Sequence, residues 1–103
     1  MIRSSIVTNY VILSSKGEND IIDITNNVEK ILLESQLKNG IITLFVVGST
    51  AAITTIEYEQ GLQRDFPTML ERIAPKGIEY EHDSTWHDGN GHAHVRAYWS
   101  VQA

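Results

Sequence analysis

The sequence predicts an α+β fold, in which two helices pack on one side of a mixed, largely antiparallel β-sheet. Residues 4–14, 41–47 and 92–102 are rich in β-branched and aromatic residues, which is typical of strands. Residues 26–40 and 60–74 instead carry apolar side chains at helical spacing. Because the two kinds of segment follow one another along the chain, we expect the helices to cover one face of a single sheet.

Length and composition restrict the class of protein. The chain has 103 residues, so we expect one domain. Its net charge is −5 and its lysines and arginines are scattered, which argues against nucleic-acid binding and against binding to anionic membranes. The absence of cysteine excludes disulfides and thiol chemistry. No apolar run is long enough to span a bilayer, so we expect a cytoplasmic protein.

The first half of the chain predicts a strand followed by a helix. Residues 4–14 form the predicted strand. Asn26 is a suitable N-cap for the helix over 26–40, with Glu29 three residues later as its capping-box partner. Gly40 is a natural residue to follow the end of this helix.

The middle of the chain predicts a buried strand and a second helix. Residues 41–47 are continuously apolar, which indicates a central strand buried on both faces. After Gly48, residues 49–59 continue with strand-like composition. Residues 60–74 then predict a helix, in which Pro67 is expected to force a break or a fresh start.

The histidines gather near the C-terminal end of the sequence. The last predicted strand places His92, His94 and Arg96 on one face, with neighbouring side chains about 7 Å apart at the backbone. His82 lies on a predicted short strand over 78–83, so three imidazoles can converge on a divalent metal, zinc or magnesium, or on a phosphate. The same pattern also suits solvent-exposed histidines or a hydrogen-bonded cluster at a subunit interface.

A second group of candidate site residues follows the predicted central strand. Ser49 and Thr50 lie where a strand ends, a place that commonly carries ligand contacts. Glu57 can act as a general base or as a partner for a histidine. Arg96 beside two histidines can hold a phosphate through two hydrogen bonds. Threonine-rich segments are also simply good strand formers, so both interpretations stay open.

Three motifs together resemble the YjbQ-type secondary thiamine-phosphate synthase family. They are GSTAAITTIEYE over 48–59, Tyr80-x-His82, and WHDGNGHAHVRA over 86–97. The resemblance covers most of the chain and implies a compact α+β fold assembled as a homotrimer. It also implies a polar pocket, whose residues by matching position are Ser49, Thr50, Glu57, His82, Asn90, His92 and His94.

The resemblance implies an enzyme that joins an aminopyrimidine pyrophosphate to a thiazole phosphate, both small phosphorylated molecules. Its catalytic residues would be Glu57, His82, His92 and His94. The substrate contacts would come from Ser49, Thr50, Asn90 and Arg96. The match weakens after Ala97, so the chain is expected to lack the family's C-terminal strands. Two alternatives are a non-enzymatic trimeric domain that binds a metal or a phosphorylated ligand, and a histidine cluster that holds subunits together.

Overall fold

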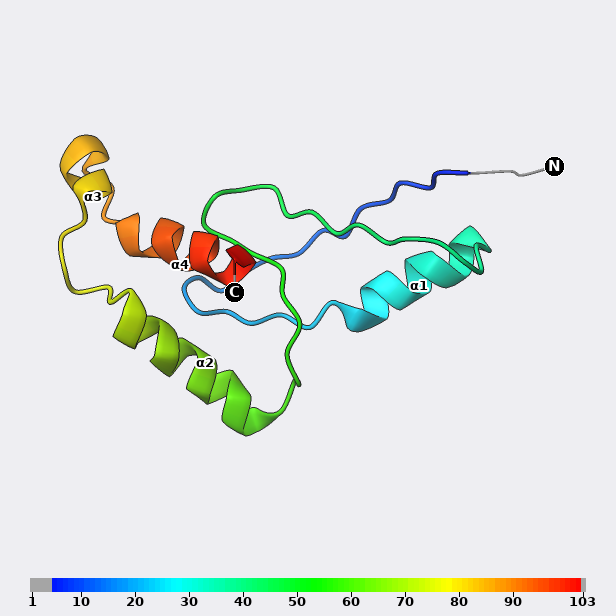
Figure 1. Ribbon diagram of the computed structural model, residues 1–103, viewed down its shortest axis with the longest axis horizontal. Coiled ribbons are helices and arrows are strands. Elements are labelled where there is room, and N and C mark those ends of the chain that lie inside the picture. Colours follow the sequence, from blue (N-terminus) through cyan, green and yellow to red (C-terminus); the bar gives the residue numbers. More distant parts are fainter. Residues whose placement is uncertain (1–4, 103) are drawn as a thin grey trace. The chain divides into compact units, whose positions relative to one another are not determined.

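The computed structural model describes residues 5–102, and these residues form four helices. They are α1 (Thr25–Ser35), α2 (Gln60–Ile73), α3 (Glu81–Trp86) and α4 (Gly91–Gln102), as Figure 1 shows. The chain divides into two units, Met1–Ile42 and Thr43–Ala103. The first unit contains α1 and the second contains the other three helices.

The predicted β-sheet is wrong, because residues 5–102 contain no strand. Within the described chain, the segments 5–14 and 41–56 have no regular secondary structure. Their β-branched composition suits extended backbone, but a strand also needs a partner that accepts and donates its ladder hydrogen bonds. Composition therefore predicted a conformation without the pairing that makes a sheet.

Two further predicted strands are helices in the structure. The second half of the segment 78–83 enters α3, and the last predicted strand, 92–102, lies within α4. The strand prediction assumed that polar side chains would point away from the core. In α4, however, His92 and Arg96 are both buried, which helical periodicity allows because they lie one turn apart.

Helix α1 begins one residue earlier and ends sooner than the sequence predicted. The carboxylate of Asp23 accepts a hydrogen bond of 2.9 Å from the backbone N–H of Thr25, so Asp23, not Asn26, supports the first turn. The helix ends at Ser35, and the next residue, Gln36, has a left-handed φ of 60° and donates its N–H to the Leu33 carbonyl. The capping box of Asn26 and the helix end at Gly40 were therefore wrong.

Helix α2 confirms the prediction for residues 60–74. Both oxygens of the Glu59 carboxylate accept hydrogen bonds from the first turn, 2.8 Å from the N–H of Gly61 and 2.7 Å from that of Leu62. The predicted break at Pro67 was wrong, because the helix continues through this residue. The stabilisation from capping and from the amphipathic face of the helix thus outweighs the loss of the one hydrogen bond that proline cannot donate.

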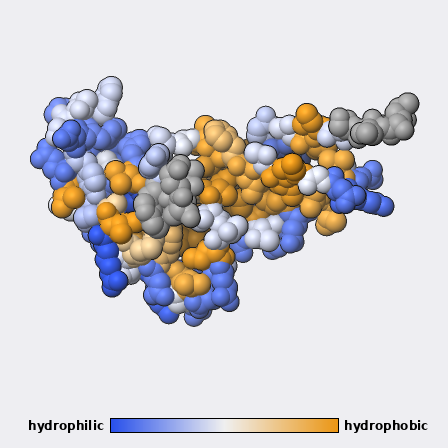
Figure 2. All heavy atoms as spheres, viewed as in Figure 1, coloured by the Kyte–Doolittle hydropathy of each residue, from blue (hydrophilic) through white to orange (hydrophobic). Residues whose placement is uncertain are grey.

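The buried core of the described residues is small and lies in the second unit. Leu70, Ala74 and Ala97 are its buried apolar side chains. The segment 41–47 is not buried on both faces, because the exposed fraction reaches 94% at Ile41. Figure 2 shows many hydrophobic side chains on the surface. None of the described helices is long and apolar enough to cross a membrane.

Candidate functional site

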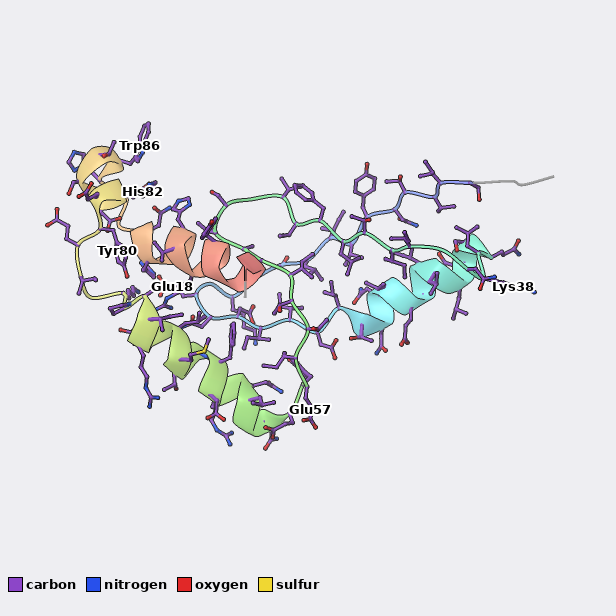
Figure 3. All side chains as sticks on the ribbon, viewed as in Figure 1. Glu18, Lys38, Glu57, Tyr80, His82 and Trp86 are labelled. Atoms are coloured by element: carbon purple, nitrogen blue, oxygen red, sulfur yellow. The ribbon has the colours of Figure 1, made fainter. Side chains whose placement is uncertain are left out.

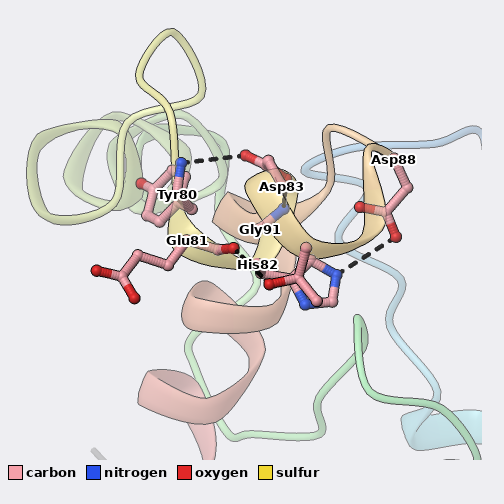
Figure 4. Close-up of polar contacts among 7 residues, drawn as sticks. Tyr80, Glu81, His82, Asp83, Asp88 and Gly91 are labelled. Atoms are coloured by element: carbon pink, nitrogen blue, oxygen red, sulfur yellow. Dashed lines mark hydrogen bonds and ion pairs between the residues drawn. The ribbon is translucent and has the colours of Figure 1, made fainter.

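The candidate site lies where the short helix α3 meets the start of α4. Asp83 joins the two helices, because its carboxylate accepts from the Tyr80 N–H at 3.2 Å and from the Gly91 N–H at 2.9 Å (Figure 4). The hydrogen bond from Gly91, supported by that from Tyr80 and by the nearby charges of His82 and His92, lowers the pKa of Asp83. Its carboxylate is thus an anionic cap on both helices.

Gly91 allows this close approach of the two helices. A Cβ atom at this position would lie 2.6 Å from the Tyr80 Cβ and 3.1 Å from a carboxylate oxygen of Asp83. The first distance is shorter than carbon atoms tolerate without movement of the backbone. Gly91 is therefore required for packing at the site.

His82 contacts an acidic residue from the loop between the helices. Its Nε2 lies 3.3 Å from Oδ2 of Asp88, as Figure 4 shows. The side chain of His82 is 32% exposed and that of Asp88 40%. The imidazole is therefore in contact with a carboxylate through Nε2, and its side chain stays about a third exposed.

Asn90 completes this contact. With its amide nitrogen turned toward the acceptors, the nitrogen lies 2.8 and 3.1 Å from the carboxylate oxygens of Asp88 and 3.0 Å from Nε2 of His82. The backbone carbonyl of Asn90 accepts from the N–H groups of Ala93 and His94, which start α4. These bonds hold the backbone of Asn90 at the start of α4.

The ring of His94 packs against the ring of His82. Their centroids are 4.4 Å apart and the planes are tilted by 50°. We call the group of His82, Asp88, Asn90 and His94 the His82 cluster. Three of its four members, His82, Asn90 and His94, are predicted site residues that the structure brings together.

His92 and Arg96 lie on a different side of α4 from His94. In a strand all three would share one face, but in a helix residues two apart point nearly opposite ways. Arg96 donates from Nε to the Ala74 carbonyl at 2.8 Å and from an Nη atom to Glu71 at 2.6 Å. These two bonds join α4 to the C-terminal end of α2. Both His92 and Arg96 are buried.

Ser49, Thr50 and Glu57 lie on the exposed irregular segment that precedes α2. Figure 3 shows Glu57 at one end of α2 and His82 beyond its other end. The 14 residues of α2 span about 20 Å, so the helix separates Glu57 from the histidines. The structure therefore does not bring these three predicted residues to the His82 cluster.

The predicted metal pocket of His82, His92 and His94 is not formed. Within residues 5–102, no three side chains of the histidine and acidic types are grouped so that they could hold a metal ion. The physical reason is the helical conformation of α4, which directs His92 into the core and His94 toward His82. Binding of a zinc or magnesium ion by the protein stays a prediction, separate from this pocket.

Sequence reasoning missed the roles of Asp83 and Asp88. Neither residue is among the candidate site residues that the sequence predicted. A capping signal was present, because Asp83 lies three residues after Tyr80, the spacing of a helix N-cap and its N3 residue. No comparable local signal points to Asp88, whose contact with His82 depends on the path of the loop.

Comparison with known families gives a match over residues 9–102 to the family described as UPF0047 protein YjbQ-like. This range covers nearly the whole chain. The chain belongs to this YjbQ-like family. The family predicted from its three motifs is thereby confirmed.

Three archaeal members of the family are similar to this chain. A UPF0047 protein of Methanothermobacter thermautotrophicus is 38% identical over 78 residues, which is 76% of this chain and 53% of that protein. Another from Archaeoglobus fulgidus is 33% identical, covering 76% of this chain and 58% of that protein. One from Methanocaldococcus jannaschii is 30% identical, covering 85% and 61%. No solved structure matches the chain.

The expected thiamine-phosphate synthase activity is not upheld. The YjbQ-like family and its three similar members are described only as UPF0047 proteins, with no such activity in their names. The histidine metal pocket on which that mechanism depended is also not formed in the described residues. The alternative of a metal-binding, non-enzymatic domain depends on the same pocket, which is not formed in the described residues. The chain spans between half and two thirds of the length of these relatives.

Proposed function

We propose that the His82 cluster is an enzyme site in which His82 donates a hydrogen bond or a proton to an oxygen atom of a small molecule. The observation that carries this proposal is the 3.3 Å contact between Nε2 of His82 and Asp88. Because this contact engages Nε2, Nδ1 is the ring nitrogen directed away from the carboxylate. The side chain of His82 is also 32% exposed, which supports access by a small molecule.

The chemistry follows from what an oriented imidazole can do. A hydrogen-bond donor fixed in place stabilises negative charge that develops on a carbonyl or phosphoryl oxygen. When the ring is protonated, Asp88 stabilises the imidazolium, as the acidic partner of a catalytic histidine does. The ring of His94, 4.4 Å from that of His82, limits rotation of the imidazole.

The small phosphorylated substrate and the homotrimer stay part of this proposal as predictions. A phosphoryl oxygen is a hydrogen-bond acceptor of the kind that an imidazole N–H recognises. The proposal does not require a metal, because the donor is a side chain of this chain. Neither the YjbQ-like family description nor the relatives' names specify a substrate.

The test is hydrolysis of p-nitrophenyl acetate, a small ester that probes a polar group able to stabilise an oxyanion. We expect His82→Phe, which keeps a ring against His94 but has no N–H, to lower the second-order rate constant about tenfold, a modest share of the effect of an acid–base group. The control is His87→Asn, because His87 is an exposed histidine at the end of α3, with a left-handed φ of 57° that asparagine tolerates.

The control variant should hydrolyse the ester as fast as the unmodified protein. Circular dichroism of each variant would verify that the helices are retained. If His82→Phe and His87→Asn have the same rate constant as the unmodified protein, His82 has only a packing role between α3 and α4.

A further inference from the structure

We propose that Asn90 is a positioning residue that places the proton of neutral His82 on Nδ1. This inference rests on the proposed function, because it states which ring nitrogen the substrate meets and in which form. The resting site then offers an N–H group, so it recognises a molecule that presents an acceptor oxygen. Neutral His82 would thus be a hydrogen-bond donor without first taking up a proton.

The first step is the orientation of the Asn90 amide. One end of the amide lies 2.8 and 3.1 Å from the two carboxylate oxygens of Asp88. A carboxylate only accepts hydrogen bonds, so an amide oxygen at these distances would be repelled. The amide nitrogen therefore faces Asp88, an assignment made from the hydrogen-bond network.

The second step concerns Nε2 of His82, which lies 3.0 Å from the same amide nitrogen. If Nε2 carried a proton, two N–H groups would face each other. If Nε2 is unprotonated, its lone pair accepts one amide hydrogen while the other hydrogen goes to Asp88. The proton of the neutral ring is then on Nδ1.

The competing arrangement is a bond from a protonated Nε2 to Asp88. That contact is 3.3 Å, longer than the 2.8 Å from the Asn90 amide to Asp88 and the 3.0 Å to His82. With the proton on Nδ1, both amide hydrogens of Asn90 make these shorter contacts. The neutral ring therefore satisfies more hydrogen-bonding atoms with its proton on Nδ1 than with its proton on Nε2. Once the ring is protonated on both nitrogens, the bond from Nε2 to Asp88 becomes the favoured one, because both groups are charged.

Other neighbours of His82 do not decide the position of the proton. The ring of His94 packs at a tilt of 50° against the ring of His82, and no hydrogen bond between the two is formed. The Asp83 carboxylate influences His82 through its charge, but its oxygens accept from the backbone N–H groups of Tyr80 and Gly91. Asn90 and Asp88 are thus the groups in contact with Nε2.

The experiment reads the ring directly by ¹⁵N NMR, through multiple-bond correlations that distinguish the two tautomers of a neutral histidine. Spectra are recorded on the full chain at about pH 8, where an ordinary histidine side chain is neutral. The signals of His82 are assigned by their loss in His82→Phe. We expect the unmodified protein to carry the proton on Nδ1.

Two variants at Asn90 test its role. Asn90→Ala removes the amide donor, and Asn90→Asp places an acceptor oxygen in its position. We expect both to move the proton of His82 to Nε2, where it bonds to an acidic side chain. The control Asn39→Ala, at an exposed asparagine outside the site, should leave the tautomer unchanged.

Two results would overturn the inference: an unmodified protein with the proton on Nε2, or a tautomer that Asn90→Ala does not change. The measurement needs no substrate, so it is independent of ester hydrolysis. A proton on Nδ1 together with unchanged hydrolysis in His82→Phe would support the role of Asn90 and reject the proposed function. The converse result would reject the role of Asn90 alone.

Discussion

Asp83 shows how one side chain determines the local geometry of the candidate site. One oxygen accepts a hydrogen bond from the N–H of Tyr80, three residues before Asp83. The other oxygen accepts from the N–H of Gly91, eight residues after Asp83. These bonds favour the charged carboxylate, which is why the pKa of Asp83 is lowered from its ordinary value. His82 is the neighbour of Asp83 in sequence, so its position depends on the same bonds.

We expect Asp83→Asn to destabilise the second unit at neutral pH, because an amide can accept through only one of its two ends. A carboxyl group whose pKa is lowered by folding stabilises the folded state above its ordinary pKa, 3.8, and loses this contribution as the pH falls through the lowered value. The difference in stability between the two proteins should therefore shrink from about pH 5 to about pH 2. Urea unfolding followed by circular dichroism at several pH values measures it.

The matched control for this prediction is Asp65→Asn, at an exposed aspartate of α2. It should change the urea midpoint little at any pH. A constant difference between Asp83→Asn and the unmodified protein across the acidic range would contradict a stabilising role of the charged carboxylate.

Helix α4 is the element in which the sequence pattern was most misleading. Alternation of polar and apolar residues predicted a strand with Arg96 on the ligand-facing side. In the structure Arg96 is buried, and its guanidinium bonds the Ala74 carbonyl and the Glu71 carboxylate, residues from the C-terminal end of α2. A buried arginine is tolerated here because both of these partners are acceptors.

We expect Arg96→Met to lower the free energy of unfolding by about 2 kcal/mol, the usual contribution of a hydrogen-bonded charged group. Methionine retains much of the side-chain volume but leaves the Ala74 carbonyl without its bond from Arg96. The side chain of Glu71 is 56% exposed, so its carboxylate regains hydrogen bonds to water, which keeps the loss moderate. Urea denaturation provides the free energy of unfolding.

Arg72→Met is the control, because Arg72 is an exposed arginine in the last turn of α2. Equal free energies of unfolding for the two variants would show that the Arg96 contacts contribute nothing to stability.

At the scale of the whole molecule, the most prominent property is the exposure of large hydrophobic side chains. The exposed fraction is 93% at Ile6 and at Ile12, and 83% at Phe45. Soluble monomers rarely expose apolar side chains in such continuous stretches, and such stretches favour association. This property supports the homotrimer that was predicted from the family resemblance, which stays a prediction.

We expect sedimentation equilibrium to give the mass of three copies. Phe45→Asp should shift the equilibrium toward the monomer, because a charge in an apolar interface is costly to bury. Thr54→Asp adds the same charge at an exposed polar position of the same irregular segment and should leave the mass unchanged. A monomeric unmodified protein would contradict the trimer.

The extent to which the fold was predictable differs from element to element. The bounds of α2 were predicted closely, because amphipathic spacing acts within the helix and the capping bonds from Glu59 reach only three residues along the chain. The segments 4–14 and 41–47 were predicted as strands, but residues 5–14 and 41–47 form none, and residue 4 lies outside the described part of the chain. Strand pairing is a relation between distant segments, and a single segment's composition does not contain it.

The sequence by itself determined the family, through motifs that lie in a fixed order, and the extent of α2. Tertiary structure decided which predicted site residues meet. His82 reaches Asp88, Asn90 and His94 only because Gly91 lets α4 approach α3. Arg96 lies outside the site because its guanidinium binds Glu71, 25 residues away in sequence. Contacts of this kind depend on the path of the whole chain, whereas helix spacing and motifs are local.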